Sequence, residues 1–473
     1  MADVTALQSL PAGRSTAGAL ASLSLAMLLS SLSTSIANVA LPTLSTVFNA
    51  SFPAVQWVVL AYLLAITALI VSVGRLGDLV GRRPLLVAGL ALFSAASLAA
   101  ALAPSLALLI AARAAQGLGA AVMMALTIAF VGETVAKERT GSAMGLLGTM
   151  SAIGTALGPS LGGVLIASVG WRSIFLVNAG LGVAAMFAAW RFLPAASVVR
   201  QPSKPARFDV IGTLLLAATL VAYALAMTMG RGHFGALNLA LLALAVLGAG
   251  LFVFAEAKVA SPLVKLALLG DPVLSPSLAM NALVSTVMMA TLVVGPFFLS
   301  RALGLSEAMT GAALSIGPVV SALCGVVAGR IVDRLGASAM VLAGLALMVA
   351  GCAALAVLPL LFGVAGYAAA VVLLTPGYQL FQAANNTAVM ADVGQGERGV
   401  VSGMLSLSRN LGLITGTAVM GALFAFAAGT SEIANAAPAA IAHGMRFTFG
   451  MAAALVLVAI LVAVLSPPAK RAA

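Results

Sequence analysis

Polar side chains recur at helical spacing within the first long apolar stretch of the chain. In "SLSTSIANVALP", residues 31–42, Ser31, Ser35 and Asn38 are followed by Pro42. That spacing places all four residues on one face of a helix. Hydroxyl and amide groups can donate and accept hydrogen bonds, but they stay uncharged at neutral pH. The stripe could form the polar wall of a cavity, or its serines could bond to carbonyls of their own helix.

Two arginines lie within apolar runs and could carry a positive charge into a membrane. Arg113 lies about two turns inside the run 106–131, and Arg409 lies inside the run 400–427. A guanidinium is costly to bury in lipid, so it normally marks a functional site or has a fixed partner. Arg113 could take part in coupling, or it could be structural, bonded to carbonyls and to Gln116. For Arg409 we favour the structural interpretation.

A pump driven by protons needs a buried group that gains and loses a proton as the site alternates. The chain has 12 Asp and Glu residues, and each lies at the end of an apolar run or in a connection. Glu133, Glu307 and Asp392 come closest to being embedded, so they are the carboxylate candidates for coupling. Cys324 and Cys352 lie in apolar runs with no clustered histidine. We therefore expect no metal site and no cofactor.

The elements that must position these groups are membrane-spanning helices. The chain has 473 residues, of which 62% are hydrophobic and only 7% are charged, whereas a soluble domain carries about 25% charged residues. Apolar runs long enough to cross a bilayer recur along the whole chain. We predict an all-α integral membrane protein with 14 spans, near 19–40, 54–73, 85–103, 106–131, 142–168, 173–192, 209–229, 237–255, 275–299, 309–330, 338–360, 363–386, 400–427 and 445–466.

The basic residues indicate how these spans are oriented. With both termini on one side, 17 of the 23 Lys and Arg residues fall on that side, 4 fall on the other and 2 lie within spans. Cytoplasmic connections carry such an excess. The sequence therefore predicts a plasma (cell inner) membrane protein with both termini in the cytoplasm. The net charge of +11 then reflects topology, and no nucleic acid partner is implied.

An internal repeat divides the spans into blocks. The segment "GRLGDLVG" (74–81) follows the second span, and "GRIVDRLG" (329–336) follows the tenth. Repeated halves around a central site are a common transporter architecture. We predict an N-terminal six-helix bundle in residues 1–192, a linker with two inserted spans in 193–274, and a C-terminal six-helix bundle in 275–473.

The longer segment "GRLGDLVGRRP", residues 74–84, resembles a signature of the major facilitator superfamily. The resemblance extends over residues 19–466 and implies the major facilitator fold, two six-helix repeats that here flank two extra helices. In that family the acidic and basic residues of the signature latch the two halves together at the cytoplasmic face. The resemblance implies a latch formed by Gly74, Asp78, Gly81 and Arg82, with Asp333 and Arg334 as a weaker second-half counterpart.

A run of glycines marks the fifth span. In "GTALGPSLGG" (154–163), Gly154, Gly158 and Gly162 are four residues apart and form one bare helix face for close packing. Pro159 removes a backbone hydrogen bond and can bend the helix. Ordinary small-residue packing is the alternative. The run resembles a signature of the family's antiporters, which implies a hinge and seal. The matching place in the second half shows no equivalent.

Three further segments resemble the fourteen-span drug/proton antiporter (multidrug efflux) branch: "LSTSIANVALP", "WRSIFLVN" (171–178) and "RFDVIG" (207–212). In that branch an Asp usually stands where this chain has Ser33. The segment "RAAQGLGAA" (113–121) resembles a span-4 motif of the wider family, in which the arginine at the place of Arg113 is linked to proton transfer. The resemblance therefore implies proton exchange, while Ser33 removes the residue that usually titrates.

These features predict a transporter and not an enzyme, since there is no nucleotide-binding loop and no catalytic set. We expect a secondary-active exporter of lipophilic or drug-like small molecules that works by alternating access, in exchange for protons and as a monomer in the lipid bilayer. The alternative is an uncoupled facilitator or metabolite carrier of the same fold. The cavity candidates are Ser35, Asn38, Tyr62, Gln116, Gln379, Gln382 and Asn385.

Overall fold

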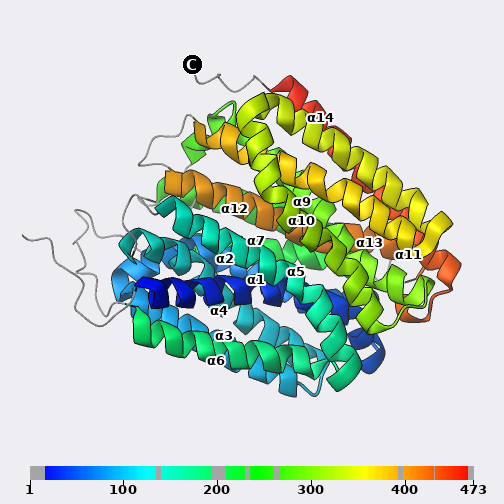
Figure 1. Cartoon of the computed structure of the whole chain (residues 1–473), viewed down its shortest axis with the longest axis horizontal. Coiled ribbons are helices and arrows are strands. Elements are labelled where there is room, and N and C mark those ends of the chain that lie inside the picture. Colours follow the sequence, from blue (N-terminus) through cyan, green and yellow to red (C-terminus); the bar gives the residue numbers. More distant parts are fainter. Residues whose placement is uncertain are drawn as a thin grey trace, which may run out of the picture.

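The computed structural model describes residues 16–134, 140–193, 209–229, 235–259, 266–391, 398–430 and 432–466. Within these ranges the regular elements are all helices, most of them running side by side (Figure 1). The first block comprises α1 (Thr16–Val47), α2 (Phe52–Val80), α3 (Arg82–Leu102), α4 (Leu106–Thr134), α5 (Thr140–Val169) and α6 (Arg172–Phe192). Figure 1 shows this block along one side of the molecule.

The second block begins after two further helices, α7 (Val210–Thr228) and α8 (Ala236–Lys258), and the short η2 (Leu266–Gly270). It comprises α9 (Leu274–Phe297), α10 (Glu307–Leu335), α11 (Ala337–Ala391), α12 (Arg398–Thr415), α13 (Gly421–Ala427) and α14 (Pro438–Leu465). The π-helical turn η3 (Phe298–Ala302) extends α9, and the π-helical turn η4 (Gly416–Met420) joins α12 to α13. The short η5 (Ile433–Asn435) precedes α14.

Helix α11 contains two of the predicted spans. Its 55 residues include Gly363, whose φ of 56° and ψ of −130° are not helical. The described residues hold 13 helices long and apolar enough to cross a membrane, and α11 is one of them. With the two arms of α11 counted separately, the 14 predicted spans are confirmed.

Several helices extend beyond the predicted spans, and for α1 and α14 a proline is involved. Helix α1 continues to Val47 because Pro42 is accommodated inside it. Helix α14 begins at Pro438, and proline is favoured in the first turn because its missing N–H needs no partner there. Arg446, at the very start of the predicted last span, therefore lies well inside α14.

The inserted pair packs on the outside of both blocks. Trp57 Nε1 of α2 donates to Thr228 Oγ1 of α7 at 3.1 Å, and Tyr223 of α7 lies 3.2 Å from the Thr415 hydroxyl of α12. Helix α8 packs against α7, and little of it is buried inside the protein. Helix α7 therefore contacts both halves, while α8 mainly faces lipid.

The two blocks use the same internal packing. Helix α1 packs against α5, and α9 packs in the same way against α12. A methyl group added to Gly154 or Gly158 of α5 would overlap Leu28 O or Ser35 Oγ of α1. A methyl group on Gly416 would lie 2.5 Å from Thr286 O of α9.

The second half thus has a glycine contact that the sequence analysis missed. Gly412 of α12 and Gly416 of η4 lie four residues apart, and both pack against α9. Two such glycines are too common in membrane helices to stand out without the partner helix in view.

The repeated segment ends in the same backbone conformation in both halves. Gly81 ends α2 with φ 95° and ψ 132°, and Gly336 ends α10 with φ 88° and ψ 146°. Side-chain-bearing residues avoid this region because Cβ would clash with the backbone. The repeat therefore encodes one glycine-dependent turn, used twice.

We expect the substitution Gly81→Ala to destabilise the protein by about 1–3 kcal/mol, the cost of forcing Cβ into a disfavoured backbone region. The space beside Gly81 is not crowded, since an added methyl group would lie 3.4 Å from Pro84. The measurement is the apparent Tm in detergent, followed by intrinsic fluorescence. The control Gly250→Ala lies in open space on helical α8 and should leave the Tm unchanged or raise it slightly. Equal Tm values for the two variants would contradict the strain argument.

Candidate functional site

The two halves meet at the end of the molecule where α1 passes into α2. Phe52 packs edge-to-face on Phe297, with ring centroids 4.8 Å apart, and on Phe424 at 5.5 Å. Gln56 Nε2 donates to Thr417 O at 2.6 Å. These contacts join α2 to α9, η4 and α13, and they close this end of the protein.

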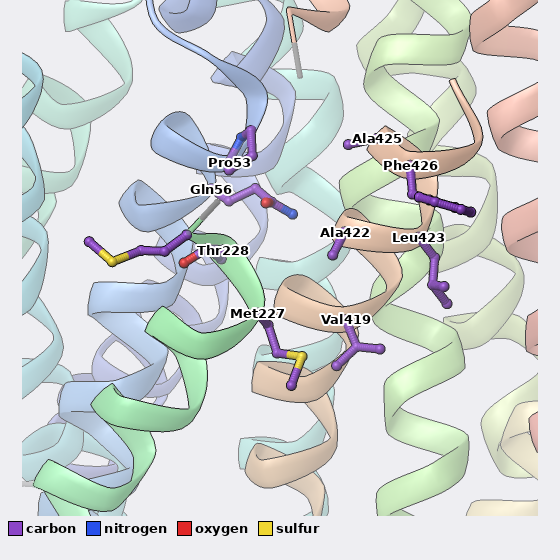
Figure 2. A pocket seen from close by; sticks show the side chains of 10 residues that line it. Pro53, Gln56, Met227, Thr228, Val419, Ala422, Leu423, Ala425 and Phe426 are labelled. Carbon is purple, nitrogen blue, oxygen red and sulfur yellow. The ribbon is translucent and has the colours of Figure 1, made fainter. Parts of the chain in front are cut away.

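Figure 2 shows part of this closed end, where Gln56 extends from α2 toward the helix that carries Ala422. A cavity of about 230 Å³ lies here between the start of α2, the end of α7 and α13. Its lining is mostly apolar, and Gln56 and Thr228 already have hydrogen-bonding partners. The cavity therefore belongs to the joint between the halves and offers little recognition chemistry.

Helices α5 and α10 bring the two halves into direct contact. A methyl group on Gly311 of α10 would lie 2.9 Å from the Cα of Gly163 in α5, and it would overlap the Pro159 carbonyl. The backbones therefore touch directly. The glycine run of α5 packs on two sides. Gly154, Gly158 and Gly162 contact α1, whereas Pro159 and Gly163 contact α10.

Away from this contact the two helices separate. Gly148 lies about three turns before Pro159 on the same face of α5, and Gly325 lies about four turns after Gly311 on α10. A methyl group added to either would meet no atom within 4 Å. The halves therefore form a V that is closed at the Gly163–Gly311 end and open at the other.

A cavity of about 150 Å³ lies at the apex of this V. One lining residue, Thr155, comes from α5 about one turn before the α5–α10 contact, and the others come from the second half. The lining is Thr155, Ser285, Met288, Met289, Thr291, Leu292, Leu314, Gly317, Pro318, Ser321, Tyr367, Val371, Leu374, Thr375, Tyr378, Arg409 and Leu413.

The first-half polar candidates lie outside this cavity, because they are buried in contacts between helices. Ser35 Oγ donates to Ser31 O and Leu32 O at 3.2 Å each, and it packs against Gly158. Asn38 Nδ2 donates to Thr34 O at 2.9 Å. For Ser35 the structure shows the bonding back to its own helix that the sequence left open as the alternative for the serines. The Asn38 amide also bonds back, while its buried Oδ1 has no hydrogen-bonding partner among the described residues.

The second-half candidates lie closer to the cavity without lining it. Gln379 Nε2 donates to Ser321 O at 3.1 Å, and Gln382 Nε2 donates to the Tyr378 hydroxyl at 3.2 Å. Ser321 and Tyr378 are both lining residues. Asn385 is fully buried against α9. The glutamines therefore position groups that reach the cavity, and direct substrate contact by any of the seven candidates stays a prediction.

Arg113 lies in a closed cage of neutral groups. Its Nε donates to Val58 O at 2.9 Å, its Nη1 to Ser33 Oγ at 3.0 Å, and its Nη2 to Ser33 O at 3.2 Å. Gln116 Oε1 is a further acceptor from Nη1. The side chain is 0% exposed, and each hydrogen-bonding partner is uncharged.

The cage is completed by an aromatic ring and by hydrogen bonds that its members, Tyr62 and Gln116, make to further residues. The Arg113 guanidinium lies over the Tyr62 ring, 4.2 Å from its centroid, and Tyr62 donates to Ser30 O at 3.0 Å. Gln116 Nε2 in turn donates to Ser97 Oγ at 2.7 Å. The cage therefore ties α1, α2, α3 and α4 together. Ser33, which stands where the related branch usually has an acid, accepts directly from Arg113.

Of the three carboxylate candidates for coupling, the structure describes the side chain of Glu307, which lies neither in the apex cavity nor in the Arg113 cage. Glu307 is exposed in the first turn of α10, the usual place for an acid that complements the helix dipole. The side chain of Glu133 and all of Asp392 lie outside the described residues. A coupling role for any of them stays a prediction.

The predicted latch lies at the open end of the V. Gly81 ends α2 and Arg82 begins α3, while Asp333 and Arg334 are exposed at the end of α10. The surroundings of Gly74 and the side chain of Asp78 lie outside the described part of the chain. An open end is the arrangement in which a latch would be released, so the latch function stays a prediction.

Three residues were undervalued by the sequence analysis. Gly163 was grouped with the glycine run, and Gly311 was not singled out, because the α5–α10 contact joins segments far apart in the chain. Arg409 was interpreted as structural. Its position within an apolar run was the only sequence signal for a cavity residue, and that signal is shared with Arg113.

Comparisons with known proteins agree on the family. The model of the Major Facilitator Superfamily matches residues 23–417. The riboflavin transporter RibZ of Clostridioides difficile is 30% identical over 397 residues, covering 84% of this chain and 86% of its own. The multidrug resistance protein Stp of Mycobacterium tuberculosis is 32% identical over 394 residues, covering 82% and 72%.

Among solved structures, the fold is similar to that of a bacterial homologue of the human lysosomal transporter Spinster, in an inward-facing and occupied conformation. The TM-score is 0.66 at 15% sequence identity, and the match covers 94% of this chain and 95% of that one. This likeness concerns the fold alone.

We expect Gly311→Leu to force α5 and α10 apart at the closed end, because its side chain would overlap the α5 backbone. Helix pairs separated by larger side chains have axes about 8–10 Å apart, so the separation should grow by roughly 2 Å or more. Spin labels at Val47 and Met309, both exposed at this end, would report the change as a distance distribution.

The matched control is Gly250→Leu, which adds the same side chain in open space on α8. It should leave the Val47–Met309 distance as in the parent. An unchanged distance in Gly311→Leu would show that the contact does not hold the halves together.

Proposed function

The chain belongs to the major facilitator superfamily, and on that premise we propose that it carries amphipathic small molecules across the membrane by alternating access around the cavity at the apex of the V. Rocking about the α5–α10 contact would open one end while the other closes. The observation that carries this proposal is the cavity itself: it lies directly beside a place where the backbones of the two halves touch.

The lining suits a molecule with an apolar body and a few polar groups. Met288, Met289 and Leu292 supply adaptable apolar surface, while Thr375 and Tyr378 supply hydroxyls. Methionine-rich surfaces accommodate ligands of different shape because the side chain is flexible and polarisable. Relatives named as a riboflavin transporter and a multidrug resistance protein support substrates of this general kind.

Export is the direction that we propose. The open end of the V carries the turns at Gly81 and Gly336, which the excess of basic residues assigns to the cytoplasm. Both termini would then be cytoplasmic, in the cell inner membrane, and the cavity would load from the cytoplasm. Names of relatives that include a drug efflux pump support this direction.

We further propose that transport runs without proton exchange through the first span. Arg113 has neutral hydrogen-bonding partners, and the residue that faces it is Ser33. No carboxylate is among the described residues that line the cavity. Neither the residues around Arg113 nor the described lining of the cavity include a carboxylate that could bind and release a proton as the protein alternates.

The test is transport by the purified full-length protein in proteoliposomes, with a pH gradient imposed and then collapsed by nigericin. The probes are two fluorescent compounds of opposite charge, dansylglycine and dansylamidoethyl-trimethylammonium. We expect at least one to move faster than in protein-free vesicles and to continue moving after the collapse. Transport that stops with the pH gradient would establish proton exchange; no movement of either probe would contradict the proposed function.

Restoring the acid should change the coupling. We expect Ser33→Asp to place a titratable carboxylate against Arg113, since Ser33 Oγ already lies 3.0 Å from Nη1. Transport by this variant should fall several-fold when the pH gradient is collapsed. Ser33→Asn is the control, because it adds a side chain of similar size that cannot titrate. If both variants respond alike, a carboxylate at this position is not enough to confer coupling.

A further inference from the structure

Arg409 differs from the other arginine within the spans. It is an exposed residue of α12 that lines the apex cavity, and it has no hydrogen-bonding or ionic partner among the described residues. Arg113, by contrast, is fully enclosed and its guanidinium is bonded to three residues. Arg113 needs no ligand to be satisfied, whereas Arg409 presents an uncompensated positive charge.

The rest of the cavity offers hydroxyls and apolar surface but no opposing charge. Hydroxyl groups come from Thr155, Ser285, Thr375 and Tyr378, and the Ser285 Oγ is buried without a partner. No Asp or Glu lies among the lining residues. The cavity therefore carries one net positive charge.

A cation in such a place attracts anions strongly. Two charges attract each other more strongly beside a protein surface than in bulk water, and a guanidinium is a preferred partner for carboxylate, sulfonate and phosphate groups. The same charge repels a cationic ligand. An unpaired ionisable residue inside a membrane protein is also costly, so it is usually retained for a function.

We infer that the apex cavity binds an amphipathic organic monoanion, whose acidic group pairs with Arg409 while its apolar body lies against Met288, Met289 and Leu292. This inference rests on the proposed function, because it names the substrate class of the same cavity. It narrows the expectation of lipophilic or drug-like small molecules to those that carry one negative charge.

The charge of the substrate would also supply the driving force. A bacterial cytoplasm is electrically negative, so the membrane potential drives anions outward. Arg409 stays with the protein and returns with it, so one complete cycle moves only the charge of the substrate. An exporter of anions therefore needs no proton-binding group, which accounts for a functional chain with Ser33 in place of an acid.

The experiment uses the full chain in vesicles of phosphatidylcholine alone, so that no anionic lipid can occupy Arg409. Valinomycin and a tenfold potassium gradient set the potential, with the lumen either positive or negative. At equilibrium a monovalent anion then reaches about a tenfold gradient. We expect dansylglycine to accumulate in vesicles with a positive lumen and to be excluded when the lumen is negative. The trimethylammonium probe should move no faster than in protein-free vesicles.

The variants assign the effect to the side chain. Arg409→Gln should weaken dansylglycine binding at least tenfold, as expected for the loss of one charge-assisted hydrogen bond, and it should abolish potential-driven uptake. Arg409→Lys keeps the charge and should retain part of both. The control Arg446→Gln removes an exposed arginine of α14 that does not line the cavity, and it should behave as the parent. Elution of each variant as a monodisperse peak establishes that it is folded.

The outcomes separate this inference from the proposed function. Transport of the cationic probe, or dansylglycine transport unaffected by Arg409→Gln, would overturn the assignment of an anionic substrate and leave the transporter proposal standing. Uptake of dansylglycine that ignores the potential would overturn the driving force. If neither probe binds to or is moved by the parent protein, the inference and the proposed function fail together.

Discussion

Direct contact between helix backbones is the constraint on which this structure depends. Lipid solvates apolar side chains as well as protein does, so helices in a membrane associate where small residues allow close approach. Helix α5 meets this requirement on two faces, one against α1 and one against Gly311 of α10. The first contact holds a half together and the second joins the halves, so a single segment links internal stability to the motion that transport would need.

The position of the second contact determines where a ligand can bind. Gly163 and Gly311 touch near one end of their helices, and the helices diverge toward the other. Side chains cannot fill the space just inside the apex, and a cavity results. The aromatic cluster of Phe52, Phe297 and Phe424 seals the narrow end. Closure and cavity are therefore two consequences of one geometry.

Two arginines within the spans show how surroundings separate structure from recognition. Arg113 is held by acceptors from three residues and by the Tyr62 ring, so its charge is dispersed within the protein. Arg409 faces the cavity and keeps its hydrogen-bonding capacity for a ligand. The same side chain is a cross-link in one half and lines a cavity in the other. The presence of Ser33, where the related branch usually has an acid, is compatible with both arginines, since neither has a carboxylate partner among the described residues.

Much of the architecture follows from the sequence because it depends on local physics. Apolar runs of sufficient length must become helices in lipid, since unpaired backbone groups are too costly there, and the repeated glycine turn at Gly81 and Gly336 marks the two halves. Which residues reach the cavity depends on contacts between helices that are distant in the chain. Ser35 and Gln116 have suitable chemistry but face neighbouring helices, while Arg409 faces the cavity. Periodicity places a residue on a face of its helix, but only the packing of the other helices decides whether that face meets protein, lipid or an open cavity.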